Sequence, residues 1–163
     1  MQNVLKFQHA KSNKIQWVTI TAVAIFHVLA AWALFTFSWQ NLLAAVITWW
    51  IAGSWGIGLG YHRLLTHGGF KTPKPVEYFL TVCGMLGLQS GAITWVTTHR
   101  IHHAFTETEN DPHSPRGGTF WSHVGWIFFG NAQNQTEATM RKYAPDLMKD
   151  PVHVFLNKYY WAV

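Results

Sequence analysis

One stretch of the sequence carries no charge over a length that few folds accommodate. No Lys, Arg, Asp or Glu lies between Lys14 and Arg63. A water-soluble domain would need polar faces over so many residues. A helix that crosses a bilayer needs about 20 consecutive apolar residues, so the stretch has room for two spans joined by a tight turn. The sequence therefore predicts an all-α, multi-pass membrane helical bundle.

We place the two predicted spans at residues 15–37 and 42–59, with the uncharged turn "SWQN" between them. Trp17 and Trp39 lie near the ends of the first span, where aromatic residues are enriched at membrane interfaces. Small residues in the second span would let a neighbouring helix approach closely. These residues are Gly53, Gly56, Gly58 and Gly60.

The formal net charge of +5 is concentrated on both sides of the uncharged stretch. The flanking cations are Lys6, Lys11 and Lys14 before it, and Arg63, Lys71 and Lys74 after it. By the positive-inside rule both outer ends face the cytoplasm, and residues 1–14 form a polar cytoplasmic arm. No basic, aromatic-interleaved segment is present, which argues against nucleic-acid binding. The single Cys83 excludes an intrachain disulfide and a thiolate metal cluster.

A third apolar stretch, residues 78–96, is rich in Gly and polar residues and makes a poor span. If it crossed the membrane, the histidines that follow it would face the opposite side from His62 and His67. We therefore expect it to dip in and return, or to lie at the interface. The later segment "TFWSHVGWIFF" is typical of an interfacial helix, and the closing "NKYYWAV" resembles the start of a further span.

Histidines are crowded into two clusters that packing alone does not explain. His99, His102 and His103 stand at i, i+3 and i+4, so on an α-helix they share one face and can converge on one metal or on two neighbouring ones. His62 and His67 are five residues apart and would point about 140° away from each other on an unbroken α-helix. Because Gly68 and Gly69 indicate a helix end, we place His62 in the last helical turn and His67 just beyond it.

The remaining histidines, and three acids, lie outside these two clusters. We expect His27 to be hydrogen-bonded between helices, and His9 and His153 to be solvated. His113 and His123 are candidates to support metal ligands from behind. The acids of the loop after the second cluster invite a carboxylate-bridged metal site, but without an ExxH spacing a solvated loop is favoured. These acids are Glu107, Glu109 and Asp111.

Together the two clusters form the boxes "HRLLTH" (residues 62–67) and "HRIHH" (residues 99–103). With them the sequence resembles the integral-membrane fatty acid desaturases, specifically their stearoyl-type Δ9 branch. The matching segments are "THRIHHAFTETENDPHSPRGGTFWSHVGWIFF" and "GLGYHRLLTHGGFKTPKPVEYFL". The resemblance covers nearly all of the chain after Lys14, and implies that residues 1–163 are the N-terminal part of a single desaturase domain.

The resemblance implies a four-span protein whose cytosolic, histidine-rich cap holds two non-haem irons. It implies that O₂ and two electrons, delivered by ferredoxin or cytochrome b5, are used to place a cis double bond, Δ9 in this branch, in a fatty acyl chain. The membrane would be the cell membrane in a bacterium or the endoplasmic reticulum in a eukaryote. Carried over by position, the iron ligands would be His62, His67, His99, His102 and His103. Gln89 and Trp95 match positions near the buried acyl chain.

Two departures from the family pattern stand out. Acyl-CoA members carry an Arg-Asp pair just before the second box, where this sequence has Thr97 and Thr98. This difference favours an acyl-lipid or another carrier-bound substrate over an acyl-CoA. The later histidine box and two later spans are absent from this sequence, so the chain resembles the first half of such an enzyme. Alternatives are a membrane di-iron hydroxylase or alkane monooxygenase, and a truncated, non-catalytic membrane protein.

Overall fold

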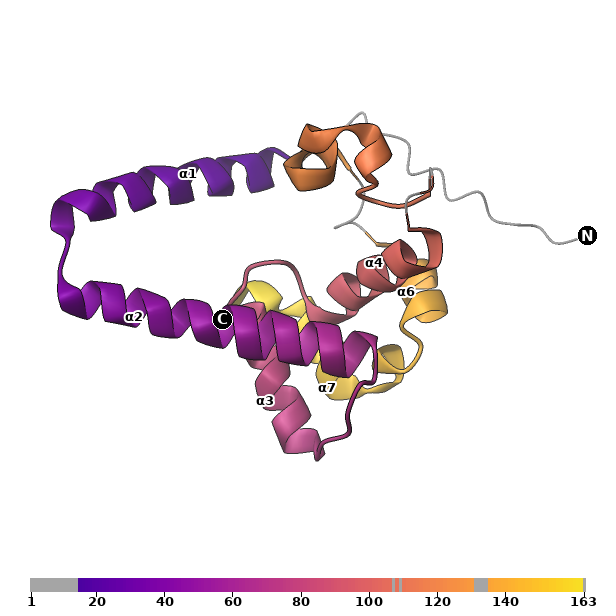
Figure 1. Ribbon diagram of the computed structural model, residues 1–163. Coiled ribbons are helices and arrows are strands. Elements are labelled where there is room, and N and C mark those ends of the chain that lie inside the picture. Colours follow the sequence, from indigo (N-terminus) through magenta and orange to yellow (C-terminus); the bar gives the residue numbers. More distant parts are fainter. Residues whose placement is uncertain (1–14, 107, 109, 131–134, 163) are drawn as a thin grey trace, which may run out of the picture.

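The computed structural model describes residues 15–106, 108, 110–130 and 135–162, and within these ranges the chain is helical without strands (Figure 1). The predicted all-α class is confirmed. Residues 1–14, the predicted cytoplasmic arm, lie outside the described residues. The helices are α1 (Trp17–Ala33), η1 (Leu34–Thr36), α2 (Trp39–Trp50), η2 (Ile51–Thr66), α3 (Lys74–Met85), α4 (Ala92–Phe105), η3 (Pro115–Gly117), η4 (Trp121–Gly125), α5 (Trp126–Phe129), α6 (Glu137–Tyr143), η5 (Leu147–Lys149), α7 (Pro151–Lys158) and η6 (Tyr160–Ala162).

The first two long helices form a hairpin that extends away from the rest of the molecule (Figure 1). α1 and η1 together match the predicted first span. The second helix begins earlier than predicted, at Trp39, because the Ser38 Oγ accepts a hydrogen bond from the Asn41 backbone N–H at 3.1 Å and caps the helix there. It also continues past residue 59 to Thr66. The predicted "SWQN" turn is therefore wrong, because three of its residues belong to α2.

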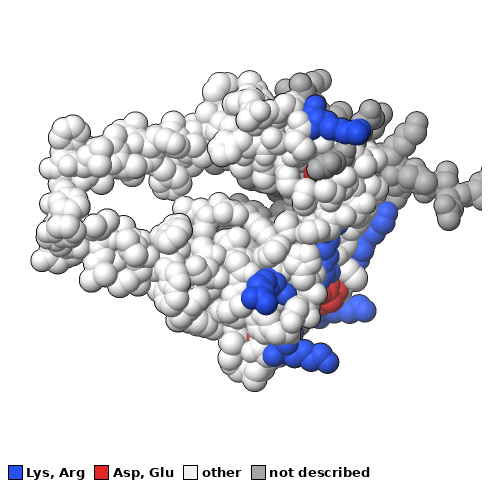
Figure 2. Space-filling view, viewed as in Figure 1, with Lys and Arg blue, Asp and Glu red and all other residues white. Residues whose placement is uncertain are grey.

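Both arms of the hairpin are long and apolar enough to cross a membrane, with 20 residues in Trp17–Thr36 and 28 in Trp39–Thr66. Most of their large apolar side chains are exposed. Residues 15–62 of the hairpin contain no Lys, Arg, Asp or Glu, and Figure 2 shows the cations only on the part of the molecule away from the tip of the hairpin. His27 lies in α1, where its Nδ1 is 2.8 Å from the Val23 carbonyl oxygen of the preceding turn. The expected hydrogen bond between helices is therefore wrong.

Glycines allow α3 to lie directly on η2. A Cβ atom at Gly56 would come within 2.4 Å of the backbone of Cys83, and one at Gly60 within 2.9 Å of the Leu80 carbonyl oxygen. At Gly53 the nearest atom would be 4.0 Å away. The predicted close approach of a neighbouring helix is thus confirmed for Gly56 and Gly60, and α3 is that helix.

The third apolar stretch is not one continuous helix. α3 ends at Met85, and α4 begins at Ala92 after a turn in which Leu88 and Ser90 have positive φ angles of 53° and 78°. The turn reverses the chain, so α4 returns to the end of η2. Tyr61, Leu65, Ile93 and Val96 are buried in the shared core of these elements. The break brings the segments that carry the two histidine boxes side by side, so that the two boxes can contribute to one site.

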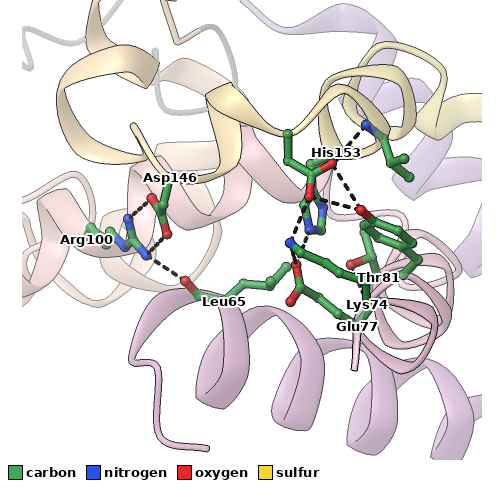
Figure 3. Close-up of polar contacts among 10 residues, drawn as sticks. Leu65, Lys74, Glu77, Thr81, Arg100, Asp146 and His153 are labelled. Carbon is green, nitrogen blue, oxygen red and sulfur yellow. Dashed lines mark hydrogen bonds and ion pairs between the residues drawn. The ribbon is translucent and has the colours of Figure 1, made fainter. Parts of the chain in front are cut away.

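The C-terminal segment is fastened to α3 and α4 by polar contacts (Figure 3). Asp150 accepts hydrogen bonds from Lys74 Nζ at 2.8 Å and from the Tyr78 hydroxyl at 3.1 Å. His153 is fully buried, and its Nε2–H donates to Glu77 Oε1 at 2.8 Å. The prediction that His153 is solvated is therefore wrong, because α7 packs its histidine against an acid of α3.

Candidate metal centre

The first histidine box lies at the end of η2, which is a π-helix with i→i+5 hydrogen bonds. The backbone N–H of His67 bonds to the carbonyl oxygen of His62 at 3.1 Å. In this winding, residues five apart lie on one face, and the two Nε2 atoms are only 3.2 Å apart. The prediction of side chains about 140° apart assumed α-helical winding and is wrong. The predicted helix end is confirmed, because His67 caps η2 and Gly68 follows with φ 58°.

The second box lies in the last turns of α4, which is α-helical as predicted. His99 and His103 are one turn apart, and their Nε2 atoms are also 3.2 Å apart. The ring of His99 lies 4.9 Å from that of His62 between centroids, and the ring of His103 lies 4.7 Å from that of His67. Each of these four side chains offers one nitrogen, and these nitrogens all lie within 4.8 Å of one another. We call His62, His67, His99 and His103 the four-histidine group.

The environment of His99 and His67 favours metal binding over protonation. Burial, together with the neighbouring imidazoles, lowers the pKa of His99 to about 3. Burial and the nearby His62 and His103 also lower the pKa of His67. Neutral imidazoles keep a lone pair available, and a metal ligand must be deprotonated to bind. Nitrogen donors of this kind suit iron as well as zinc or copper.

His102 turns away from the four-histidine group and forms a second group with Asp111 and His113. An ionised carboxylate is only an acceptor, so His102 donates its Nδ1–H to Asp111 Oδ1 at 2.9 Å. The His102 and His113 rings stack with centroids 4.1 Å apart. One ligand atom from each of these three residues lies within 4.8 Å of the others. The sequence left open whether His99, His102 and His103 converge on one point or on two neighbouring ones. In the structure they belong to two neighbouring groups.

Asp111 is the site residue that the sequence interpretation missed. The side chain of Asp111 has no exposed surface, so its assignment to a solvated loop is wrong. The loop folds back over α4, and the carboxylate holds both His102 and the backbone N–H of His113, the latter at 3.1 Å. Glu107 and Glu109 lie outside the described residues. His123 is exposed in η4 and belongs to none of the candidate groups among the described residues.

A cavity of about 370 Å³ adjoins both groups. Gln89 and Trp95 line it, as do His99 from the four-histidine group and His113 from the second group. Trp95 donates its Nε1–H to Gln89 Oε1 at 3.1 Å, and its ring lies 4.7 Å from that of His99. The two residues predicted near a substrate therefore contact each other between the cavity and the histidines.

A third set of potential ligands consists of Glu77, Asp150 and His153. The ammonium of Lys74 already lies between its two carboxylates, 2.7 Å from Glu77 and 2.8 Å from Asp150. A cation is thus supplied by the chain itself. We interpret this set as a structural fastening between α3 and α7.

The sequence was compared with known proteins, and no protein-family model matches it. The chain is 42% identical over 149 residues to sn-1 stearoyl-lipid 9-desaturase of Anabaena variabilis, which covers 90% of this chain and 54% of the relative. It is 42% identical over 154 residues to sn-2 palmitoyl-lipid 9-desaturase of Nostoc sp. (strain 36), and the match covers 94% of this chain and 54% of the relative. It is 39% identical over 155 residues to icosanoyl-CoA 5-desaturase of Limnanthes douglasii, and the match covers 94% of this chain and 44% of the relative.

The chain belongs to the stearoyl-type desaturase family. Its similarity to these desaturases runs through both histidine boxes, because the matches cover nine tenths or more of its length. The chain spans about half the length of the desaturases it matches. Relatives named for acyl-lipid and for acyl-CoA substrates, and for positions 9 and 5, are all found at similar identity.

Proposed function

We propose that this chain provides the first two histidine boxes of an O₂-dependent desaturase that places a cis Δ9 double bond in a fatty acyl chain. The observation that carries the proposal is the convergence of the two boxes, which are distant in sequence. Four imidazoles from the end of η2 and from α4 converge, with one nitrogen of each within 4.8 Å of the others. A fifth histidine, His102, is held beside them by Asp111. The identity to named acyl desaturases supports the same reaction.

The donor set fits a pair of non-haem irons. His62, His67, His99 and His103 would hold one iron, and His102 would contribute to the other. Bound iron would supply the activation of O₂ that removal of two hydrogens from an unactivated methylene requires. The chain's own residues orient these ligands: Asp111 fixes the ring of His102 by its Nδ1–H, and Trp95 packs on the ring of His99. Such outer contacts set the tautomer and direction of a ligating histidine.

The cavity beside the histidines would receive the acyl chain. Its lining joins α1 (Thr19 and Val23) to the turn before α4, and ends at His99 and His113. Apolar clefts of roughly 300 to 1,000 Å³ are typical of small-molecule sites. The hydrogen bond between Gln89 and Trp95 would fix one wall of this cavity.

Two observations bear on the carrier of the acyl chain. Thr97 is fully buried, so it is not positioned to contact a head group. Thr98 Oγ1 accepts a hydrogen bond from Gln135 Nε2 at 3.1 Å. Neither residue offers the charges that an acyl-CoA carrier would engage, which favours an acyl-lipid substrate.

We place the α1–α2 hairpin in the bilayer and the histidine groups at its cytosolic surface. The apolar, exposed hairpin and the cations on the opposite part of the molecule support this orientation (Figure 2). The membrane would be the cell membrane of a bacterium or the endoplasmic reticulum of a eukaryote. Electrons would reach the irons from ferredoxin or cytochrome b5.

The test is to express the full reading frame of the gene in a host that cannot make unsaturated fatty acids. The host should supply both candidate electron donors, ferredoxin and cytochrome b5. Gas chromatography with mass spectrometry of the fatty acids should show a cis-9 monoenoic product that is missing from the His99→Ala variant. A hydroxylated acyl product would instead support the hydroxylase alternative. Absence of both products, with the protein present in the membrane and the electron donors active, would contradict the proposal.

A further inference from the structure

Arg100 lies between the ligands of the second box but takes no part in either histidine group. All five of its guanidinium N–H donors are engaged. Nη1 donates to the Tyr143 carbonyl oxygen at 2.9 Å and to Asp146 Oδ1 at 2.7 Å. Nη2 donates to the Leu65 carbonyl oxygen at 2.6 Å and to Asp146 Oδ2 at 3.0 Å, and Nε donates to the Thr66 carbonyl oxygen at 3.3 Å. Figure 3 shows Arg100 reaching both Leu65 and Asp146.

Two of these acceptors are the last residues of η2, directly before His67. The final carbonyl groups of a helix have no partner within the helix, and they attract cations. Arg100 supplies that partner from α4, the helix that carries His99 and His103. It therefore joins the end of one histidine box to the middle of the other.

The remaining contacts anchor the guanidinium from its other side. Asp146 forms a two-pronged pair with it, and this geometry is more directional than a single ion pair. The carboxylate also neutralises a cation that would otherwise lie beside a metal-binding group. Tyr143 and Asp146 belong to the segment around α6 that packs on α4, so three parts of the chain meet at one side chain.

We infer that Arg100 is a positioning residue of the metal centre: it holds the end of η2 against α4 so that the four-histidine group converges. This inference rests on the proposed function, because it assumes that the group binds a metal. Asp146 acts through Arg100 by fixing its direction and balancing its charge.

The experiment is a Co²⁺ titration of the purified chain in detergent, followed by ligand-field absorption, with metal per chain measured by mass spectrometry. Arg100→Gln should lower Co²⁺ affinity about tenfold to a hundredfold and shift the absorption bands. Arg100→Lys should recover only part of the affinity, because an ammonium cannot replace the five-donor fork. Arg141→Gln is the matched control: it breaks an exposed Arg–Glu pair and should leave affinity and spectrum unchanged.

Wild-type affinity and spectrum in Arg100→Gln would overturn the inference. If Arg100→Gln loses its helical circular dichroism, Asp146→Asn decides, because it leaves the bonds to Leu65 and Thr66 in place. Its Co²⁺ affinity should fall about tenfold, at the lower end of the same range, and an unchanged affinity would overturn the inference. If the wild-type chain binds no Co²⁺, the proposed metal site fails and the inference with it. If Co²⁺ binds as expected but the expressed gene yields no desaturated product, only the desaturase function fails.

Discussion

Asp111 fixes the direction of His102: the Nδ1–H of the imidazole points at a carboxylate oxygen 2.9 Å away, and the carboxylate side chain is fully buried. With Nδ1 engaged in this way, Nε2 of His102 is the nitrogen left to bind a metal. A buried acid in a loop after a histidine box is thus part of the site, although it is not a ligand of the four-histidine group.

Replacing Asp111 should weaken metal binding at His102 without unfolding the chain. We expect Asp111→Ala to lower iron affinity at this group about tenfold to a hundredfold. Asp111→Asn keeps an acceptor for the Nδ1–H and should lose less. Metal content of the purified variants, measured after dialysis against graded chelator, distinguishes the two. Equal iron retention in the wild type and Asp111→Ala would show that the contact has no orienting role.

His102 and His123 provide a matched pair for the reaction itself. His102→Ala in the protein expressed from the full reading frame should abolish desaturation while membrane insertion stays unchanged, because a ligand is removed and no span is altered. His123→Ala changes the same residue type at an exposed position outside the candidate groups and should keep the wild-type product yield. Product analysis beside membrane fractionation checks both, and activity in His102→Ala would refute the ligand assignment.

Packing of α3 on η2 predicts a position-dependent cost for added methyl groups. A Cβ at Gly56 would meet the Cys83 backbone at 2.4 Å, which the helices relieve only by moving apart. We expect Gly56→Ala to lower the free energy of unfolding by about 1 to 3 kcal/mol. Gly53→Ala, with 4.0 Å to its nearest neighbour, should cost nothing measurable. Thermal unfolding of both variants in the same detergent gives the comparison, and equal midpoints would contradict the close contact.

The fastening between α3 and α7 predicts a loss of stability in acid. Burial alone would raise the pKa of Asp150, but hydrogen bonds from Lys74 and Tyr78 bring it down to about 2 from its ordinary 3.8. Glu77 accepts bonds from Lys74 and His153, and its pKa is lowered as well. A lowered carboxyl pKa stabilises the folded state above the unfolded pKa of about 4. The contribution disappears as the pH falls from there towards 2.

Asp150→Asn should therefore unfold at a lower temperature than the wild type at pH 7, and the gap should narrow between pH 4 and pH 2. Glu137→Gln is the control, because its pair with Arg141 lies on the surface with both side chains more than half exposed. Surface pairs of this kind contribute about 0 to 1 kcal/mol. A gap for Asp150→Asn that stays constant down to pH 2 would contradict the assignment.

The sequence predicted local spacing where the helix is α-helical, and missed both the π-helical winding of the first box and what depends on tertiary contact. His99 and His103 were correctly paired because α-helical winding brings i and i+4 together wherever the helix packs. The burial of His153 depends on Glu77, which lies in another helix and far away in sequence. No pattern around His153 signals that contact. The same holds for Asp111, whose charged neighbours made a solvated loop the reasonable prediction.

The histidine pair of the first box is one residue further apart in sequence than that of the second box. The helix that carries the first box also has more residues per turn, because it is a π-helix and not an α-helix. His99 and His103 meet over four residues of α-helix, whereas His62 and His67 meet over five residues of π-helix, with the same 3.2 Å between nitrogens. The π-helix also sets the angle between two faces of η2, one buried on α3 through Gly56 and Gly60, the other bearing histidines towards α4. A deletion inside the first box would therefore require rewinding of the helix end, which would rotate these two faces relative to each other. In this protein the length of a motif and the pitch of its helix can change only together.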